Sequence, residues 1–193
     1  MSVLSLLDVA VQVVRALEDM QVRFLIGGSL ASSAMGTPRA SLDADIVADL
    51  RAEHADELVS RLGTAFYASG DMIREAVRSR SSFNVVHIAS GFKVDVFILK
   101  NRAFDRQAFE RVVVRAWPGE SRRDVPFCSA EDIILHKLEW YRIGGEVSER
   151  QWSDVVGVVQ VQGDRLDRDY IQKWSAELQV ADLWARAWEA ASP

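Results

Sequence analysis

The sequence predicts an α/β (α+β) fold that ends in a helical part, and three observations support this. Segments typical of strands and of helices follow one another through the first two thirds of the chain. Beyond Phe127 the patterns are helical only. The 193 residues are 49% hydrophobic and 26% charged, which suits one domain with a small appendage and excludes a disordered or fibrous chain. We therefore expect a core at residues 1–126 and a helical subdomain at residues 127–193.

The first elements come from apolar patterns that glycines interrupt. An amphipathic helix is expected first, with an apolar side made of Leu6, Val9, Val13, Val14 and Leu17. Val22 to Ile26 is then a short apolar strand, which stops at Gly27-Gly28. Ser29 is placed to cap a helix that runs to Met35. The alternating pattern of residues 42–47 predicts the next strand.

Later elements show the same signals. Residues 51–62 are expected to form a helix that ends at Gly63. Phe83–Ile88 and Phe92–Leu99 are expected strands on either side of a tight turn, and residues 111–117 form another.

The C-terminal third is expected to be helical. Ser129 and Ser148 each begin a capping-box pattern, which marks a helix start. All six tryptophans lie at or after Trp117. Large aromatic rings mostly serve packing, so we expect these to form the core of a helical subdomain rather than a surface for stacking bases.

The charge balance speaks against a protein that coats nucleic acid. The net charge is −5, whereas such proteins carry a basic surplus. Between Asp71 and Asp124, however, eleven basic residues stand against seven acidic ones. This segment is either a solvated arginine-rich surface or a place that receives a polyanionic ligand.

The sequence also predicts a cytoplasmic location. Cys128 is the one cysteine and cannot form an internal disulfide, and the first residues lack the pattern of a signal peptide. No stretch approaches the roughly 18 uninterrupted apolar residues of a membrane span, so no membrane partner is expected.

Three acidic residues on two expected strands carry the candidate chemistry. Asp43 and Asp45 are two residues apart, so both carboxylates project from the same face of their strand. The residues expected to enter the core there are Leu42, Ala44 and Ile46. Asp95 lies in a later strand, and an adjacent place in the sheet would set it beside the pair. Carboxylates on rigid strands suit Mg²⁺, and three acids around two metals suit an in-line phosphoryl displacement.

Each acid alone also has a structural reading, since Asp-x-Asp pairs are common and Asp95 suits the exposed side of a half-buried strand. The order of the parts favours chemistry. A strand runs into Gly27-Gly28-Ser29 and a helix start, and the acid pair follows. Glycines let a backbone approach a phosphate, and free N–H groups at a helix start attract anions. A phosphate site beside a metal site is typical of nucleotide chemistry.

These residues resemble the DNA polymerase beta-like nucleotidyltransferase superfamily, and within it the abortive-infection (AbiEii-like) toxin group and related uncharacterised bacterial nucleotidyltransferases. The motifs that carry the resemblance are Gly27-Gly28-Ser29, Gly36-x-Pro38-Arg39, Ser41-x-Asp43-x-Asp45-Ile46 and Asp95. Many relatives have threonine where Ser41 stands, a conservative difference. The resemblance implies a nucleotidyltransferase-type mixed β-sheet flanked by helices. It also implies Mg²⁺ (or Mn²⁺) held by the three acids and a nucleoside triphosphate bound near the Gly-Ser turn.

The resemblance extends to the helical part, where the toxin group completes its site with a lysine on one helix and an acid on the next. Lys137 and Asp154 match these positions. Lys137 lies on the apolar stripe of its expected helix, where a cation needs an anionic partner unless its ammonium reaches water. The alternative interpretation of Asp154 is an ion-pair partner for Arg150, four residues earlier on the same expected helix. Arg39 reaches either a triphosphate or a nearby acid.

Together these features predict a nucleotidyltransferase that moves a nucleoside monophosphate from a nucleoside triphosphate to an acceptor hydroxyl by two-metal phosphoryl transfer. The expected catalytic residues are Asp43, Asp45, Asp95 and Lys137, and the expected nucleotide-binding residues are Gly27, Gly28, Ser29, Arg39, Lys137 and Asp154. The toxin resemblance implies an acceptor on RNA, particularly a tRNA 3′ end, or on protein, with a cognate antitoxin as partner. A small-molecule, antibiotic-type nucleotidyltransferase and a non-catalytic nucleotide-binding module of the same fold stay open as alternatives.

Overall fold

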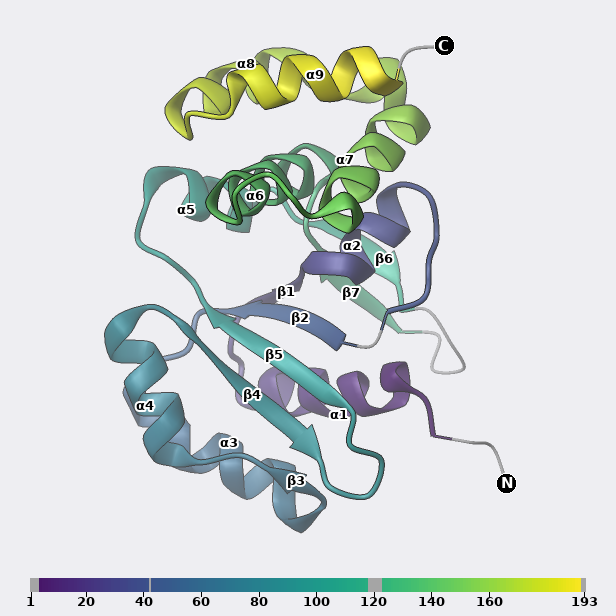
Figure 1. Ribbon diagram of the computed structural model, residues 1–193. Helices are drawn as coiled ribbons and strands as arrows, with labels where there is room; N and C mark the ends of the chain where they lie inside the picture. The colour runs from purple at the N-terminus through teal and green to yellow at the C-terminus, as the bar shows by residue number, and fades with distance from the viewer. Residues whose placement is uncertain (1–3, 42, 118–122, 192–193) are drawn as a thin grey trace. The chain divides into compact units, whose positions relative to one another are not determined.

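The structure, a computed structural model, describes residues 4–41, 43–117 and 123–191 (Figure 1). Leu42, expected in the core, lies outside these residues. Contacts divide the chain into two compact units: Met1–Ile26 with Ser41–Phe127, and Gly27–Ala40 with Cys128–Pro193. The sequence pattern put residues 27–40 with the first part, whereas contacts group them with the C-terminal helices. The reason is packing, because the helix within this segment contacts two of those helices.

In its described residues, the first unit contains a seven-stranded mixed sheet in the order β3-β4-β5-β2-β1-β7-β6. Its strands are β1 (Phe24–Ile26), β2 (Asp43–Ala48), β3 (Phe66–Tyr67), β4 (Ser82–His87), β5 (Lys93–Ile98), β6 (Val113–Ala116) and β7 (Asp124–Phe127). β2 runs parallel to β5 and antiparallel to β1, and β1 runs parallel to β7. The predicted α/β class, with a mixed sheet and flanking helices, is confirmed.

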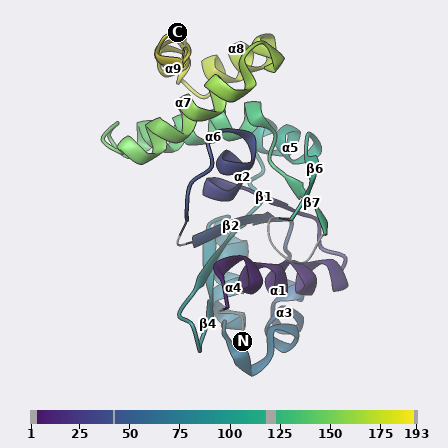
Figure 2. The ribbon, with the colours of Figure 1, turned by 90° about the vertical axis from the view of Figure 1, so that its right-hand side faces the viewer.

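The described part of the first unit has four α-helices, and two of them pack directly against the sheet. The four helices are α1 (Leu6–Asp19), α3 (Ala55–Leu62), α4 (Gly70–Ser79) and α5 (Ala103–Glu110), with short 3₁₀ turns at Ala52–His54 and Gly63–Ala65. α1 contacts β2, β5 and α3, and α4 contacts β4 and β5 (Figure 2). The predicted apolar side of α1 is buried. Since side chains alternate along a strand, the buried residues Ala44, Ile46, Val94 and Val96 leave their neighbours on the opposite face.

The second unit is helical, as the sequence predicts. Its helices are α2 (Gly28–Met35), α6 (Ala130–Ile143), α7 (Glu149–Gln162), α8 (Arg168–Glu177) and α9 (Ala181–Ala191), with a 3₁₀ turn at Gly163–Arg165. Ser129 and Ser148 cap α6 and α7 through their hydroxyls, which confirms both predicted starts. Ser29 is not a cap: the N-cap of α2 is Gly27, and Ser29 lies inside the helix. Among the described residues, none of the helices is both long and apolar enough to cross a membrane.

Gly36 lets the end of α2 lie directly against the backbone of α7. A Cβ at Gly36 would stand 2.7 Å from the backbone nitrogen and Cα of Val158. Backbone atoms of a helix cannot move aside as a flexible side chain can, so Gly36→Ala is expected to lower the free energy of unfolding by about 1–3 kcal/mol. Urea unfolding would measure this loss. Gly157→Ala is the milder control, because its Cβ would first meet the side chain of Thr37, at 3.1 Å. An equal loss of unfolding free energy in both variants would contradict the close backbone contact between Gly36 and Val158 as its cause.

Candidate functional site

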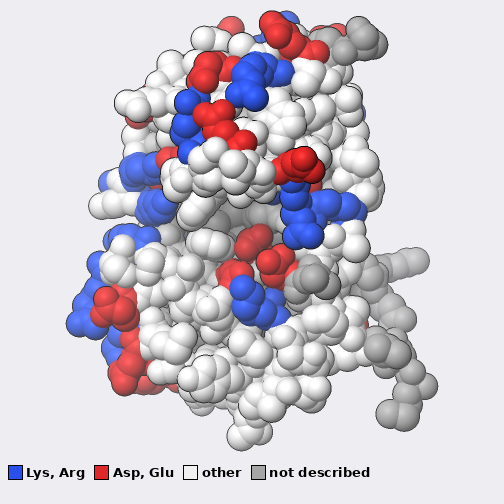
Figure 3. Space-filling view, viewed as in Figure 1, with Lys and Arg blue, Asp and Glu red and all other residues white. Residues whose placement is uncertain are grey.

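The three predicted acids share the polar face of the sheet in the first unit. β2 and β5 are parallel neighbours, and their register sets Asp45 opposite Asp95 and Asp43 opposite Lys93. The four side chains lie on one face, because the residues between them point to the buried side. Figure 3 shows carboxylates gathered there beside a cation, over β2 and β5. We call Asp43, Asp45 and Asp95 the acidic face.

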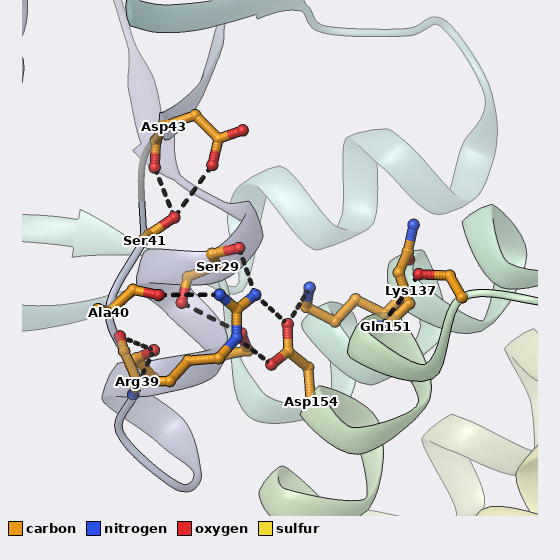
Figure 4. Close-up of polar contacts among 11 residues, drawn as sticks. Ser29, Arg39, Ala40, Ser41, Asp43, Lys137, Gln151 and Asp154 are labelled. Atoms are coloured by element: carbon orange, nitrogen blue, oxygen red, sulfur yellow. Dashed lines mark hydrogen bonds and ion pairs between the residues drawn. The ribbon is translucent and has the colours of Figure 1, made fainter. Parts of the chain in front are cut away.

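Neighbouring side chains already engage the acidic face. Asn84, on β4 and opposite Asp95, donates a hydrogen bond from Nδ2 to Asp95 Oδ1. Lys93 Nζ lies 2.8 Å from Asp95 Oδ2. Ser41 donates from Oγ to Asp43 Oδ1 at 3.0 Å (Figure 4). Both oxygens of Asp95 are therefore in use.

All three carboxylates of the acidic face act on the pKa of Lys93. Its hydrogen bond to Asp95 raises the pKa of Lys93, partial burial acts in the opposite direction, and the charges of Asp95, Asp43 and Asp45 raise it further. The net pKa shift is upward, so the ammonium stays charged beside the three carboxylates.

The acidic face matches Mg²⁺ in donor chemistry but not in arrangement. Mg²⁺ takes oxygen ligands in near-octahedral geometry, and three carboxylates on one face supply oxygen donors. Yet in the described part of the chain no group of three or more His, Cys, Asp or Glu side chains is arranged to hold a metal ion. The two oxygens of Asp95, which a metal would need, are bonded to Lys93 and Asn84 in this structure.

The predicted residues of the second unit meet around one carboxylate. Lys137 on α6 places Nζ 2.8 Å from Asp154 Oδ2, on α7. Arg39 donates to the same carboxylate twice, from Nε to Oδ1 at 2.6 Å and from Nη2 to Oδ2 at 2.7 Å. Arg39 Nη2 also donates to Ser29 Oγ at 2.7 Å (Figure 4). We call Arg39, Lys137 and Asp154 the cation cluster.

The cation cluster is buried and carries a net positive charge, since two cations share one carboxylate. The side chains of Lys137 and Asp154 are 9% and 5% exposed, and that of Arg39 is 25% exposed. Burial raises the pKa of Asp154, but the hydrogen bonds and charges of Arg39 and Lys137 outweigh it and lower this pKa below 3.8. Asp154 therefore stays ionised and holds both cations in place.

These contacts decide between the readings that the sequence left open. Lys137 does not reach into water; it has the anionic partner that a buried cation needs. Asp154 pairs with Arg39 and Lys137 across helices instead of serving Arg150 one turn away. Arg39 pairs with an acid in this structure.

Gly27 and Gly28 form the start of α2. Gly27 is the N-cap, and Gly28 has a φ of 51°, a conformation that favours glycine. Ser29 follows within the helix, and its hydroxyl accepts the hydrogen bond from Arg39. The Gly-Ser turn is thereby tied to the cation cluster through Arg39.

A cavity of about 380 Å³ in the second unit borders the cation cluster. Its lining includes Thr37, Arg39, Trp152, Asp154, Gly157 and Gln160. The volume falls at the lower end of the range for small-ligand pockets. The indole of Trp152 already contacts the ring of Tyr141 and the guanidinium of Arg186. The cavity therefore offers a ligand the exposed part of Arg39 beside a mostly apolar lining.

Sequence reasoning missed Lys93 and Asn84. Lys93 stands two residues before Asp95, so strand alternation alone places it on the acidic face. Asn84 had no such signal, because its position opposite Asp95 depends on the register between β4 and β5.

No family model and no curated protein matches this chain. Among solved structures, it is similar to the antibiotic-resistance factor ANT(2'')-Ia, whose solution structure has a TM-score of 0.57 at 14% identity and covers 93% of each chain. The crystal structure of ANT(2'')-Ia in complex with adenylyl-2''-tobramycin also has a TM-score of 0.57, at 13% identity, and covers 90% of this chain and 96% of that chain. The lincosamide antibiotic adenylyltransferase LnuA, bound to lincomycin, has a TM-score of 0.48 at 14% identity, and the match covers 79% of this chain and 95% of LnuA.

The likeness to ANT(2'')-Ia extends over nearly the whole of both chains. At 13–14% sequence identity it shows a shared fold and nothing about activity. The chain has the nucleotidyltransferase-type fold that the sequence resemblance implies.

Proposed function

We propose that this protein is a Mg²⁺-dependent nucleotidyltransferase (Mn²⁺ being an alternative ion) that moves a nucleoside monophosphate from a nucleoside triphosphate to an acceptor hydroxyl. The observation that carries the proposal is the parallel register of β2 and β5, which sets Asp45 opposite Asp95 with Asp43 on the same face. Three carboxylates on rigid neighbouring strands are the oxygen donors that a two-metal phosphoryl transfer requires. An intact acid triad also argues against a non-catalytic module.

In this proposal Asp43, Asp45 and Asp95 hold the metal, which would supply Lewis-acid polarisation of phosphoryl oxygens when bound. Asp95 would take the proton of the acceptor hydroxyl. The acceptor oxygen forms a bond to the α-phosphorus, the bond between that phosphorus and the bridging oxygen breaks, and pyrophosphate leaves. Such a transfer depends mainly on positioning and charge neutralisation.

The cation cluster is proposed to bind the triphosphate. Arg39 and Lys137 supply positive charge, and Ser29, with the glycines before it, supplies hydroxyl and backbone donors. Asp154 acts on the nucleotide through these cations, because both of its oxygens are bonded to them. We therefore propose Asp154 as a positioning residue for Arg39 and Lys137.

We propose RNA as the acceptor, in particular a tRNA 3′ end, and protein as the alternative acceptor. In this proposal the chain is an AbiEii-like toxin that has a cognate antitoxin and acts in the cytoplasm. The basic surplus between Asp71 and Asp124 supports a polyanionic acceptor. A small-molecule acceptor is the second candidate. It is supported by the likeness to ANT(2'')-Ia, which has been solved with adenylyl-2''-tobramycin.

The test is transfer of label from each α-³²P nucleoside triphosphate in the presence of Mg²⁺. The acceptors are total RNA, a protein extract and a panel of aminoglycosides and lincosamides. We expect labelled RNA with the wild-type protein, and label on the drugs alone would select the small-molecule candidate. Asp49→Asn serves as the control for loss of an acid outside the acidic face. Asp49 is an exposed acid just beyond β2, so this variant should transfer label as the wild type does. Absence of label on every acceptor would refute the proposed activity.

A further inference from the structure

Lys93 pairs with Asp95 on the acidic face, and the charges of Asp43 and Asp45 act on it as well. It stands opposite Asp43 in the register, two residues before Asp95 on the same strand face, and its Nζ is 2.8 Å from Asp95 Oδ2. Its side chain is 44% exposed, whereas that of Asp95 is 14% exposed. The ammonium therefore sits at the edge of the site with a path to solvent.

The two partners of Asp95 differ in charge and in freedom of movement. Asn84 is neutral, sits directly across the ladder from Asp95 and donates to Oδ1. Lys93 is charged, flexible and bound to Oδ2. If the lysine withdraws, Asn84 still holds Oδ1, and Oδ2 becomes available on the strand face that Asp95 shares with Asp43 and Asp45 of β2. Asn84 is thus a positioning residue, and Lys93 is the group that can leave.

A divalent cation and the Lys93 ammonium cannot both occupy this position. Both seek the oxygens of Asp95, and two like charges within a few ångströms of each other repel. A half-exposed ion pair is worth little, because its attraction is screened and it costs the freedom of a long side chain. A divalent ion, which interacts with each carboxylate through twice the charge, is therefore able to displace the lysine.

We propose that Lys93 competes with the divalent metal ion for Asp95 and so sets the metal concentration at which the acidic face fills. The ammonium keeps the carboxylates compensated, and metal binding moves it from Asp95 Oδ2 into solvent. This inference rests on the proposed metal role of Asp43, Asp45 and Asp95.

Mn²⁺ binding tests the competition without nucleotide or acceptor. Free Mn²⁺ is counted by electron paramagnetic resonance during titration of the full chain. Lys93→Met is expected to bind Mn²⁺ about three- to tenfold more tightly than the wild type, because it keeps the stem and removes the competing charge. Lys93→Arg retains the charge and should bind no more tightly than the wild type. Lys100→Met is the matched control for loss of one lysine from the same unit, and should change the affinity less than twofold.

Asp95→Asn should lose the measured site in both the wild-type and the Lys93→Met background. If Lys93→Met fails to fold by circular dichroism, Lys93→Gln takes its place. Unchanged or weaker Mn²⁺ binding in the folded Lys93 variant would overturn the inference and leave the proposed transfer activity untouched. Absence of label transfer from a protein that shows the expected Mn²⁺ affinities would overturn the activity alone. Absence of Mn²⁺ binding in the wild type and all variants would overturn the inference together with the proposed metal role.

Discussion

Replacing Asp154 with alanine is expected to lower the free energy of unfolding of the second unit by about 3–5 kcal/mol, because it removes the buried carboxylate that Arg39 and Lys137 share. Arg39 and Lys137 both bond to this carboxylate, and none of the three side chains is more than 25% exposed. Water can reach Arg39 in part and Lys137 hardly at all. Most of the loss is therefore the cost of a buried, unpaired ammonium.

Urea unfolding followed by tryptophan fluorescence is the measurement, since five of the six tryptophans lie beyond residue 128, in the second unit. Asp182→Ala is the matched control. Asp182 also pairs with an arginine, Arg142, in the same unit, but its side chain is 62% exposed. Exposed pairs contribute about 0–1 kcal/mol, so this control should change little. Similar losses of unfolding free energy in Asp154→Ala and Asp182→Ala would contradict the burial of the cation cluster as the cause.

The pH dependence of the Asp154→Ala effect gives a second readout. The pKa of Asp154 is lowered in the folded protein, since the bonds and charges of Arg39 and Lys137 outweigh the opposing effect of burial. A lowered folded pKa stabilises the protein above the ordinary value of 3.8, and this stabilisation is lost as the pH falls through the folded pKa. The difference in stability between wild type and variant should therefore be constant near neutral pH and shrink below about pH 4. A difference that stays constant down to pH 3 would argue for a packing defect.

Asp45→Asn is expected to lower the rate of nucleotidyl transfer by about 10²- to 10³-fold. Asparagine keeps the size and the strand position of the side chain but removes a negative charge directly opposite Asp95. Under the proposed metal role of the acidic face, loss of one carboxylate removes several kcal/mol of charge stabilisation in the transition state, which corresponds to this factor.

The measurement is the initial rate of label transfer at saturating nucleotide, with the acceptor that the wild-type protein labels. The Asp49→Asn variant controls for the loss of an acid from this segment, because Asp49 is exposed and directly follows the last residue of β2. Asp45→Asn should unfold at the same urea concentration as the wild type, because Asp45 lies on the polar face. A variant that transfers at the wild-type rate would show that Asp45 has no part in the reaction.

Much of the fold is readable in the sequence, because local patterns determine local structure. The apolar stripe of α1 and the capping serines of α6 and α7 predict helices that the structure contains. Local signals fail where tertiary contacts decide. Ser29 looks like a helix cap, yet Gly27 takes that position and the Ser29 hydroxyl accepts a bond from Arg39. The segment 27–40 follows a strand in sequence but packs with the C-terminal helices.

By itself, the sequence determined which residues share the acidic face within each strand, because side chains of a strand alternate with a period of two. Asp43 with Asp45, and Lys93 with Asp95, follow from that period alone. Only the tertiary structure decided which strands are neighbours, and so which residues stand opposite Asp95. It also decided that Arg39 and Lys137 share Asp154, a carboxylate 115 residues from Arg39. The physical reason is that ion pairs between distant elements depend on how helices and strands pack, which no local period encodes.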